Sequence, residues 1–277
     1  MIFIRLATIA AIIASLSACA TYQVNSQQYV PKDLGKLSLL KKIAPTYQLE
    51  NVEYVQQDGA ISRGMSLHKA DAQFTVLYFM GAGIRVDVNG AQMAKPFTEL
   101  NANFISFDYR NFGRSDAPNS NVNLVDLEND TLALYDHIRK ITPGKLIVHG
   151  HSFGSFIAAN LASKRALDGL VLEGTGTTAQ AYSDNMIPWY AKPFVTIKLD
   201  QELQSIDNRQ FLKQYAGPLL ILSGSNDVQT PAATARELFQ ALDKPNKRYE
   251  ELQQAGHMNI LSKPEALQAY REFIQSH

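Results

Sequence analysis

The stretch Lys145–Arg165 reads KLIVHGHSFGSFIAANLASKR, and it predicts a strand that turns directly into a helix. Lys145–His149 is a short apolar run, as expected for a strand buried on both faces of a sheet. Phe153–Arg165 is rich in small and apolar residues, which allow a helix to pack closely against such a sheet. Strand and helix in direct succession are the repeating unit of an α/β fold.

The turn between them, Gly150–Gly154 (GHSFG), has the pattern G-x-S-x-G. A strand that reverses this sharply into a helix forces its central serine into a strained backbone conformation. Only residues the size of glycine avoid a clash two positions to either side of Ser152. The serine hydroxyl then stands clear of the sheet at a helix N-terminus, where the helix dipole favours developing negative charge. The context predicts Ser152 as a nucleophile rather than a structural serine.

A serine nucleophile needs a base to take its proton, and the base needs a third group to orient it. In this arrangement the chain order is serine, acid, histidine. Asp227 lies on the loop after the apolar run Leu219–Leu222, and Pro231 begins a helix four residues later. His257 follows the next predicted strand and precedes the last helix. We therefore predict Ser152, Asp227 and His257 as a catalytic triad.

Other acidic and imidazole groups lie near the predicted site. Glu173 follows the predicted strand Leu167–Leu172 and is the alternative acid in a variant geometry. His149 and His151 flank the turn, where the pleat of the strand decides which way each ring points. Neither histidine has the loop context that is expected of the base.

From residue 47 onward, strand-like and helix-like segments alternate, which predicts a mostly parallel sheet with helices on both faces. Between residues 175 and 217 this alternation breaks down. We interpret that insertion as a small cap over the C-terminal edge of the sheet, because long insertions in compact domains are usually functional or disordered. An ordinary surface excursion with a small core of its own is the alternative. The insertion is too aromatic for disorder, with Tyr182, Trp189, Tyr190, Phe194 and Phe211.

Together with the turn, the segment Phe107–Asp116 (FDYRNFGRSD) resembles the α/β-hydrolase superfamily over about residues 54–277. The segment is similar to the D-Y-R-G-x-G-x-S pattern of the branch that includes serine aminopeptidase-like and monoacylglycerol-lipase-like enzymes. The resemblance implies the α/β-hydrolase fold and hydrolysis of an ester, thioester or amide through an acyl-enzyme. It also implies that neither a metal nor an organic cofactor takes part.

The sequence departs from this family at the expected oxyanion hole. Members usually carry His-Gly after the third strand, whereas this chain has Phe79–Gly83 (FMGAG), with Met80 in the place of the histidine. The resemblance assigns the two oxyanion donors to the backbone N–H groups of Ala82 and Phe153. Because these donors are main-chain groups, the loss of the histidine side chain need not remove them. Because Met80 removes the polar side chain that anchors this loop in the family, the resemblance does not determine the shape of the loop.

The N-terminal segment predicts an export signal followed by a lipid anchor. Leu6–Leu16 (LATIAAIIASL) has the length of a signal-peptide core and is shorter than the roughly 20 apolar residues that span a membrane. Leu16–Cys19 (LSAC) resembles the lipobox of bacterial lipoproteins, and Cys19 is the only cysteine of the chain. The resemblance implies that residues 1–18 are removed and that Cys19 carries acyl groups such as palmitate. A plain secretory signal, or an uncleaved anchor with Cys19 incidental, is the alternative.

The lipobox resemblance also predicts where the protein is located. Ala20 follows the cysteine, and in Gram-negative lipoproteins this implies sorting to the outer membrane, on the periplasmic side of the cell envelope. Several acyl chains would hold the protein on the membrane stably. Residues 19–46 then form the lipidated N-terminus and tether, and residues 47–277 form the hydrolase domain.

The composition limits the classes of partner. The 26 acidic and 26 basic residues balance, so no net charge attracts nucleic acid. A single cysteine excludes an intrachain disulfide and a cysteine-rich metal site. We expect a serine hydrolase acting on a small-molecule or lipid-like acyl substrate, most simply a carboxylic ester. Two alternatives stay open: an aminopeptidase, for which Asp184 and Asp200 are acidic groups in the cap, and a non-catalytic lipid-anchored binding protein.

Overall fold

The computed structural model describes residues 20–23, 44–119, 122–185, 187, 190–191 and 193–277. The predicted signal peptide and the predicted lipidation site at Cys19 lie outside these residues, as does most of the predicted tether. None of the helices in the described ranges is long and apolar enough to cross a membrane.

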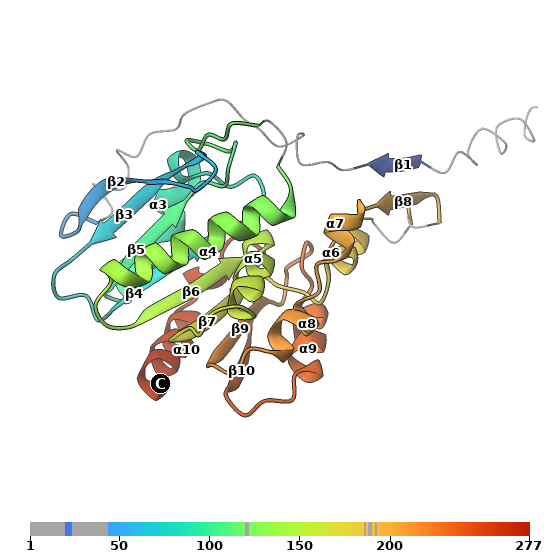
Figure 1. The fold of residues 1–277 in the computed structure, drawn as a ribbon. Helices are drawn as coiled ribbons and strands as arrows, with labels where there is room; N and C mark the ends of the chain where they lie inside the picture. The colour runs from blue at the N-terminus through green and yellow to red at the C-terminus, as the bar shows by residue number, and fades with distance from the viewer. Residues whose placement is uncertain (1–19, 24–43, 120–121, 186, 188–189, 192) are drawn as a thin grey trace, which may run out of the picture.

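An eight-stranded sheet forms the centre of the molecule, with the strand order β10-β9-β7-β6-β4-β5-β3-β2 (Figure 1). Neighbouring strands run parallel from β10 to β5, whereas β3 is antiparallel to both β5 and β2. The prediction of a mostly parallel sheet is confirmed. The strands are β2 (Gln48–Val55), β3 (Ile61–His68), β4 (Phe74–Phe79), β5 (Ala102–Phe107), β6 (Leu146–His151), β7 (Gly169–Glu173), β9 (Leu219–Gly224) and β10 (Lys247–Leu252).

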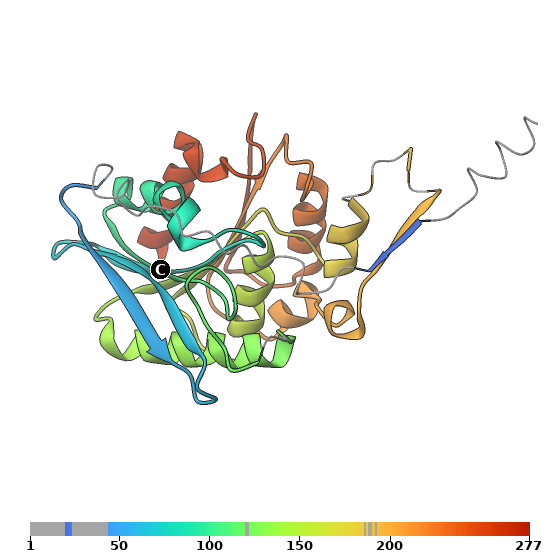
Figure 2. The ribbon, with the colours of Figure 1, turned by 90° about the horizontal axis from the view of Figure 1, so that it is seen from above.

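Helices cover both faces of this sheet, as Figure 2 shows from above. On one face lie α3 (Val86–Glu99) and α10 (Pro264–Ser276), and their apolar side chains share one core cluster. On the other face lie α4 (Leu124–Ile141), α5 (Phe153–Ala162) and α9 (Ala232–Ala241), which share a second cluster. The sheet therefore lies between two helical layers, as the alternating pattern predicted.

The central strand β4 shows why its sequence is apolar throughout. Val76 and Tyr78 pack into the cluster beside α3 and α10, while Leu77 and Phe79 pack into the cluster beside α4 and α5. Side chains alternate between the two faces of a strand, so a strand covered on both faces needs apolar residues at every position. All six residues of β4 are buried.

In its described residues, the insertion between β7 and β9 contains four short elements: α6 (Ala179–Asn185), β8 (Val195–Lys198), α7 (Gln201–Gln204) and α8 (Asn208–Lys213). The buried Asn208 side chain joins it to the end of β7, because its Nδ2 donates to Thr175 Oγ1 (3.1 Å) and to the Gly176 carbonyl (3.0 Å). Strand β1 (Ala20–Gln23) pairs in parallel with β8 and makes a separate two-stranded sheet with it (Figure 1). The cap boundaries at 175 and 217 stay a prediction.

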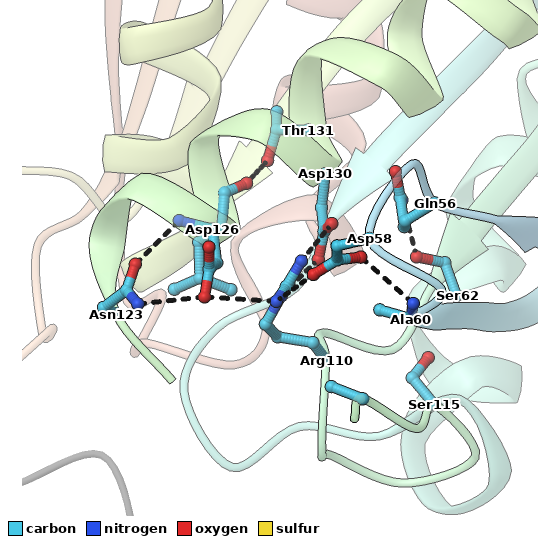
Figure 3. Close-up of polar contacts among 12 residues, drawn as sticks. Gln56, Asp58, Ala60, Ser62, Arg110, Ser115, Asn123, Asp126, Asp130 and Thr131 are labelled. Carbon is cyan, nitrogen blue, oxygen red and sulfur yellow. Dashed lines mark hydrogen bonds and ion pairs between the residues drawn. The ribbon is translucent and has the colours of Figure 1, made fainter. Parts of the chain in front are cut away.

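A buried arginine joins three segments on one side of the sheet (Figure 3). The Arg110 side chain is 5% exposed, and its guanidinium donates to both carboxylate oxygens of Asp130 on α4, at 2.8 and 2.6 Å. It also contacts Asp58 in the β2–β3 turn (3.0 Å) and Asp126 in the first turn of α4 (3.2 Å). These ion pairs tie the hairpin and α4 to the loop after β5.

We predict that Arg110→Ala lowers the free energy of unfolding by about 3–5 kcal/mol, because it leaves the buried Asp130 carboxylate unpaired. Urea denaturation at neutral pH measures this loss. Lys95→Ala is the control. Lys95 and Glu99 are one helical turn apart on α3, and their exposed ion pair (Nζ to Oε1, 4.0 Å) is worth a few tenths of a kcal/mol. Equal losses in the two variants would contradict the prediction.

Candidate active site

Ser152 lies at the turn between β6 and α5, with φ 54° and ψ −120°. Two close backbone approaches explain the glycines around it. A Cβ on Gly150 would lie 2.2 Å from the Gly154 carbonyl oxygen, and a Cβ on Gly154 would lie 2.0 Å from the Phe79 carbonyl oxygen. Neither position accepts a side chain, so this geometry is the sharp turn that the G-x-S-x-G pattern predicts.

Asp227 and His257 form a buried hydrogen-bonded pair. Nδ1 of His257 lies 2.8 Å from Oδ2 of Asp227, and the two residues are 8% and 4% exposed. Thr230 supports the carboxylate, because its hydroxyl donates to Oδ2 (2.6 Å) and its backbone N–H donates to Oδ1 (2.8 Å). Burial alone would raise the pKa of Asp227, but the hydrogen bonds from His257 and Thr230 outweigh it and lower that pKa. The ionised carboxylate favours the tautomer with a proton on Nδ1, which leaves Nε2 free to accept one.

The loop that carries His257 lies against the turn that carries Ser152. The rings of His257 and His151 have their centroids 4.8 Å apart, and His151 directly precedes the serine. The backbone N–H of Ser152 donates to the Glu173 carbonyl (2.9 Å), and a Cβ on the next residue, Gly174, would lie 3.2 Å from the His257 ring. Among the residues that the structure describes, no hydrogen bond joins the Ser152 hydroxyl to His257. Such bonds often form only when substrate binds.

Glu173, the alternative acid, has other partners. Its carboxylate lies 3.1 Å from Nε2 of His149 and accepts a hydrogen bond from the backbone N–H of Leu261 at 3.3 Å. Asp227, rather than Glu173, makes the hydrogen bond to the His257 ring. The geometry therefore favours Asp227 over Glu173 as the acid of the proposed triad.

The loop after β4 passes beside the serine. A Cβ on Gly81 would lie 3.1 Å from the Ser152 Cβ. The Met80 side chain is buried in the core beneath α3, and the Met80 carbonyl accepts a hydrogen bond from the Tyr109 hydroxyl at 2.7 Å. Burial raises the pKa of Tyr109, so this hydroxyl stays protonated and can donate. Tyr109 thus gives the loop the polar anchor that a methionine side chain cannot supply, a role that the sequence did not reveal.

The two proposed oxyanion donors are the backbone N–H groups of Ala82, in the loop after β4, and of Phe153, which directly follows Ser152. Phe153 is the first residue of α5, so its N–H has no acceptor within the helix. Ala82 is exposed in the turn that the Ile84 N–H closes onto the Gly81 carbonyl at 3.2 Å. In the described part of the chain neither amide makes a hydrogen bond, which leaves both available to a ligand.

A mostly apolar cavity lies between α4, α5 and the chain that leads into α8. Its empty volume is about 510 Å³, including the open mouth. None of the three proposed triad residues lines it. Its apolar walls come from Leu124, Leu132, Phe156, Ile157, Ile206 and Phe211.

Comparison with known structures identifies the architecture. Residues 83–195 match the family described as alpha/beta hydrolase fold. The Pyrococcus furiosus esterase Pf2001 superposes with a TM-score of 0.71 at 18% identity, covering 91% of this chain and 99% of that one. The chain has the α/β-hydrolase fold. A second α/β hydrolase, GrgF from Penicillium sp. sh18, superposes with a TM-score of 0.66 at 14% identity, covering 83% and 99%.

Sequence relatives of this chain include lipases. Lysophosphatidylserine lipase ABHD12 of Danio rerio is 28% identical over 179 residues, which are 59% of this chain and 46% of that protein. The protein of the same name in Mus musculus is 26% identical over 223 residues, covering 72% and 55%. The chain thus spans about half the length of these curated relatives. The uncharacterized protein YfhR of Escherichia coli strain K12 is 22% identical over 210 residues, covering 73% and 71%.

We predict that Thr230→Val destabilises the fold in a pH-dependent way. Because the folded-state pKa of Asp227 is lowered, its contribution to stability is present above the unfolded pKa of about 3.9 and is lost as the pH falls through the folded value. Removing the Thr230 hydroxyl brings the two pKa values closer together. The free energy of unfolding should fall by about 2 kcal/mol at pH 7 and by clearly less at pH 3, as measured by urea denaturation.

Thr234→Val is the matched control for this variant. Thr234 lies on α9, and its hydroxyl donates to the Pro231 carbonyl (2.8 Å) rather than to a carboxylate. Its effect on stability should not change with pH. A pH-independent loss in Thr230→Val would show that its hydroxyl does not stabilise the ionised carboxylate.

Proposed function

We propose that this protein, which has the α/β-hydrolase fold, is a serine hydrolase that cleaves a carboxylic ester through an acyl-enzyme intermediate. Ser152 is the nucleophile, His257 is the general base, and Asp227 orients the imidazole. The observation that carries the proposal is the buried 2.8 Å contact between Asp227 and His257, beside a serine held at φ 54°. Activated nucleophiles are recognised by this arrangement of roles rather than by sequence position.

In the proposed cycle, His257 Nε2 takes the hydroxyl proton as Ser152 Oγ attacks the carbonyl carbon of the ester. Asp227 stabilises the imidazolium that forms. The N–H groups of Ala82 and Phe153 bind the oxyanion, and each donor of this kind stabilises the transition state by about 3–4 kcal/mol. The imidazolium then protonates the leaving alcohol. Water, deprotonated by His257, attacks the acyl-enzyme and releases the carboxylic acid and free Ser152.

A lipid-like ester is the substrate class that the observations favour. Lipases and an esterase are among the proteins that the chain resembles. For an aminopeptidase, the cap would have to offer a carboxylate to the substrate amine. Asp184 instead accepts a hydrogen bond from Gln180 (2.8 Å), and Asp200 caps α7 through the Leu203 N–H (2.8 Å). Both acidic groups have local partners, so we propose esters over aminoacyl amides.

For the location, we propose that Cys19 is acylated and holds the domain at the periplasmic face of a bacterial outer membrane. The proposal rests on the lipobox-like segment Leu16–Cys19 and on the absence of any other cysteine in the sequence. Dual or triple acylation gives the stable attachment that one chain does not.

We predict that a fluorophosphonate probe labels the protein covalently and that Ser152→Ala abolishes this labelling. Turnover of short p-nitrophenyl esters should fall at least about 10³-fold in the same variant, because the nucleophile is gone. Ser163→Ala is the control, since Ser163 follows the last residue of α5 and its hydroxyl donates to the Asn160 carbonyl (2.7 Å). Hydrolysis of aminoacyl amides is measured in parallel with labelling and ester turnover.

Three outcomes are informative. Normal labelling of Ser152→Ala would remove the assignment of the nucleophile. A folded wild type that neither labels nor hydrolyses any ester would point to a non-catalytic binding protein. Faster cleavage of aminoacyl amides than of esters would favour the peptidase alternative.

We also predict that the protein expressed in a Gram-negative host incorporates radioactive palmitate and sediments with membranes. Cys19→Ser should lose the label, because the thiol is the group that accepts the acyl chain. Ser17→Ala keeps a small residue at its position and should label normally. Equal incorporation into Cys19→Ser would overturn the anchor.

A further inference from the structure

Three buried titratable groups lie on β6 and β7, next to the turn that carries Ser152, and the proposed catalytic cycle uses none of them. His149, His151 and Glu173 are 0%, 1% and 4% exposed. His149 and His151 lie two positions apart on β6, so their side chains share one face of the sheet, and His151 is paired with Glu173 across β6 and β7. Buried polar groups are costly unless they are hydrogen-bonded, so their partners indicate what they do.

His151 is hydrogen-bonded to the backbone of the proposed base. Its Nε2 lies 2.9 Å from the carbonyl oxygen of His257. A carbonyl only accepts, so Nε2 carries the proton. Burial is the main cause that lowers the pKa of His151. The neighbouring His257 and His149 lower this pKa further, and the charge of Glu173 opposes the shift without reversing it. The His151 ring therefore stays neutral. The ring is therefore a fixed donor to the loop that carries His257.

The opposite side of the same ring lies against the proposed oxyanion loop. A Cβ on Gly81 would be 3.1 Å from His151 Nδ1, so the glycine leaves room for the ring. Nδ1 is buried and has no hydrogen-bond partner among the described residues. The His151 ring thus lies between the Gly81 loop and the His257 carbonyl.

A second contact holds the same histidine loop from the same face of the sheet. Oε1 of Glu173 accepts a hydrogen bond from the Leu261 N–H at 3.3 Å, four residues after His257. The other oxygen of Glu173 contacts His149 Nε2 at 3.1 Å, and His149 in turn stacks on Tyr270 with ring centroids 5.9 Å apart. The hydrogen bonds from His151 and to Glu173 therefore hold the loop near its start and near its end.

We propose that His151 is a positioning residue for the reaction proposed above, on which this inference rests. His151 and Ser152 share a peptide bond, so the hydrogen bond from His151 connects the backbone of the nucleophile to the backbone of the base. Glu173, held by His149, is the second anchor of the loop. Without the His151 contact the loop can shift relative to Ser152, and a misplacement of about 1 Å costs on the order of 10²-fold in rate.

The test compares His151→Met with His151→Gln. Methionine fills a similar space but has no donor, whereas the glutamine amide nitrogen can reach the position of the imidazole Nε2. For p-nitrophenyl ester hydrolysis we expect His151→Met to lower kcat about 10- to 100-fold with KM within about twofold. The rate of fluorophosphonate labelling should fall in parallel. His151→Gln should recover most of both losses.

Amide hydrogen exchange gives a readout that does not depend on activity. Peptides covering residues 256–262 should exchange faster in His151→Met than in wild type, and near the wild-type rate in His151→Gln. Tyr135→Phe is the control, because it removes a hydrogen bond to the Ala166 carbonyl (2.7 Å) far from the histidine loop. This variant should change neither labelling nor exchange in that loop.

The outcomes separate this inference from the proposed function. If wild type reacts and His151→Met has the wild-type kcat, labelling rate and loop exchange, the positioning role is overturned. If His151→Gln is as impaired as His151→Met, the lost hydrogen bond is not the cause and the inference also fails. If wild type is inert, the proposed function fails, and hydrogen exchange still decides whether His151 holds the loop.

Discussion

The strained backbone at Ser152 is the constraint on which the rest of the structure depends. A non-glycine residue at φ 54° and ψ −120° costs on the order of 1–3 kcal/mol, and it persists only where its surroundings hold it. Here both backbone groups of the serine are bonded. Its N–H donates to the Glu173 carbonyl (2.9 Å), and its carbonyl accepts from the Ser155 hydroxyl (2.6 Å). Gly150 and Gly154 then allow β4, β6 and α5 to approach as closely as the turn requires.

Each part of the candidate site is supported by a residue outside the proposed triad. Thr230 bonds the acid, Tyr109 bonds the loop after β4, and His151 bonds the carbonyl of the proposed base. All of these contacts lie at the edge of the apolar core, where a hydrogen bond is stronger than in water and an unpaired polar group is more costly. The geometry at the serine therefore depends on several buried polar contacts that are made at once.

Local sequence patterns predicted the parallel sheet, its helical layers and the turn, because strand, turn and helix follow one another directly in residues 145–165. Asp227 was predicted as the acid with Glu173 as the alternative, since the direction of a side chain beyond a strand depends on packing from distant segments. His151 was passed over because its partner lies 106 residues away. Thr230, three residues after Asp227, was the support that spacing alone could have indicated. The lipid anchor and the cap boundaries stay predictions.

The two outer strands, β2 and β10, bear on how copies of the chain meet one another. An unpaired edge offers free N–H and C=O groups to any neighbouring strand, and charged side chains there oppose such pairing. Strand β10 reads KRYEEL, and β2 carries Glu50 and Glu53. In the described part of the chain, both outermost strands of this sheet thus bear charges that discourage strand-to-strand aggregation. For a protein that accumulated on a two-dimensional surface, where local concentrations are high, this protection would let neighbouring copies crowd together without fusing into a continuous sheet.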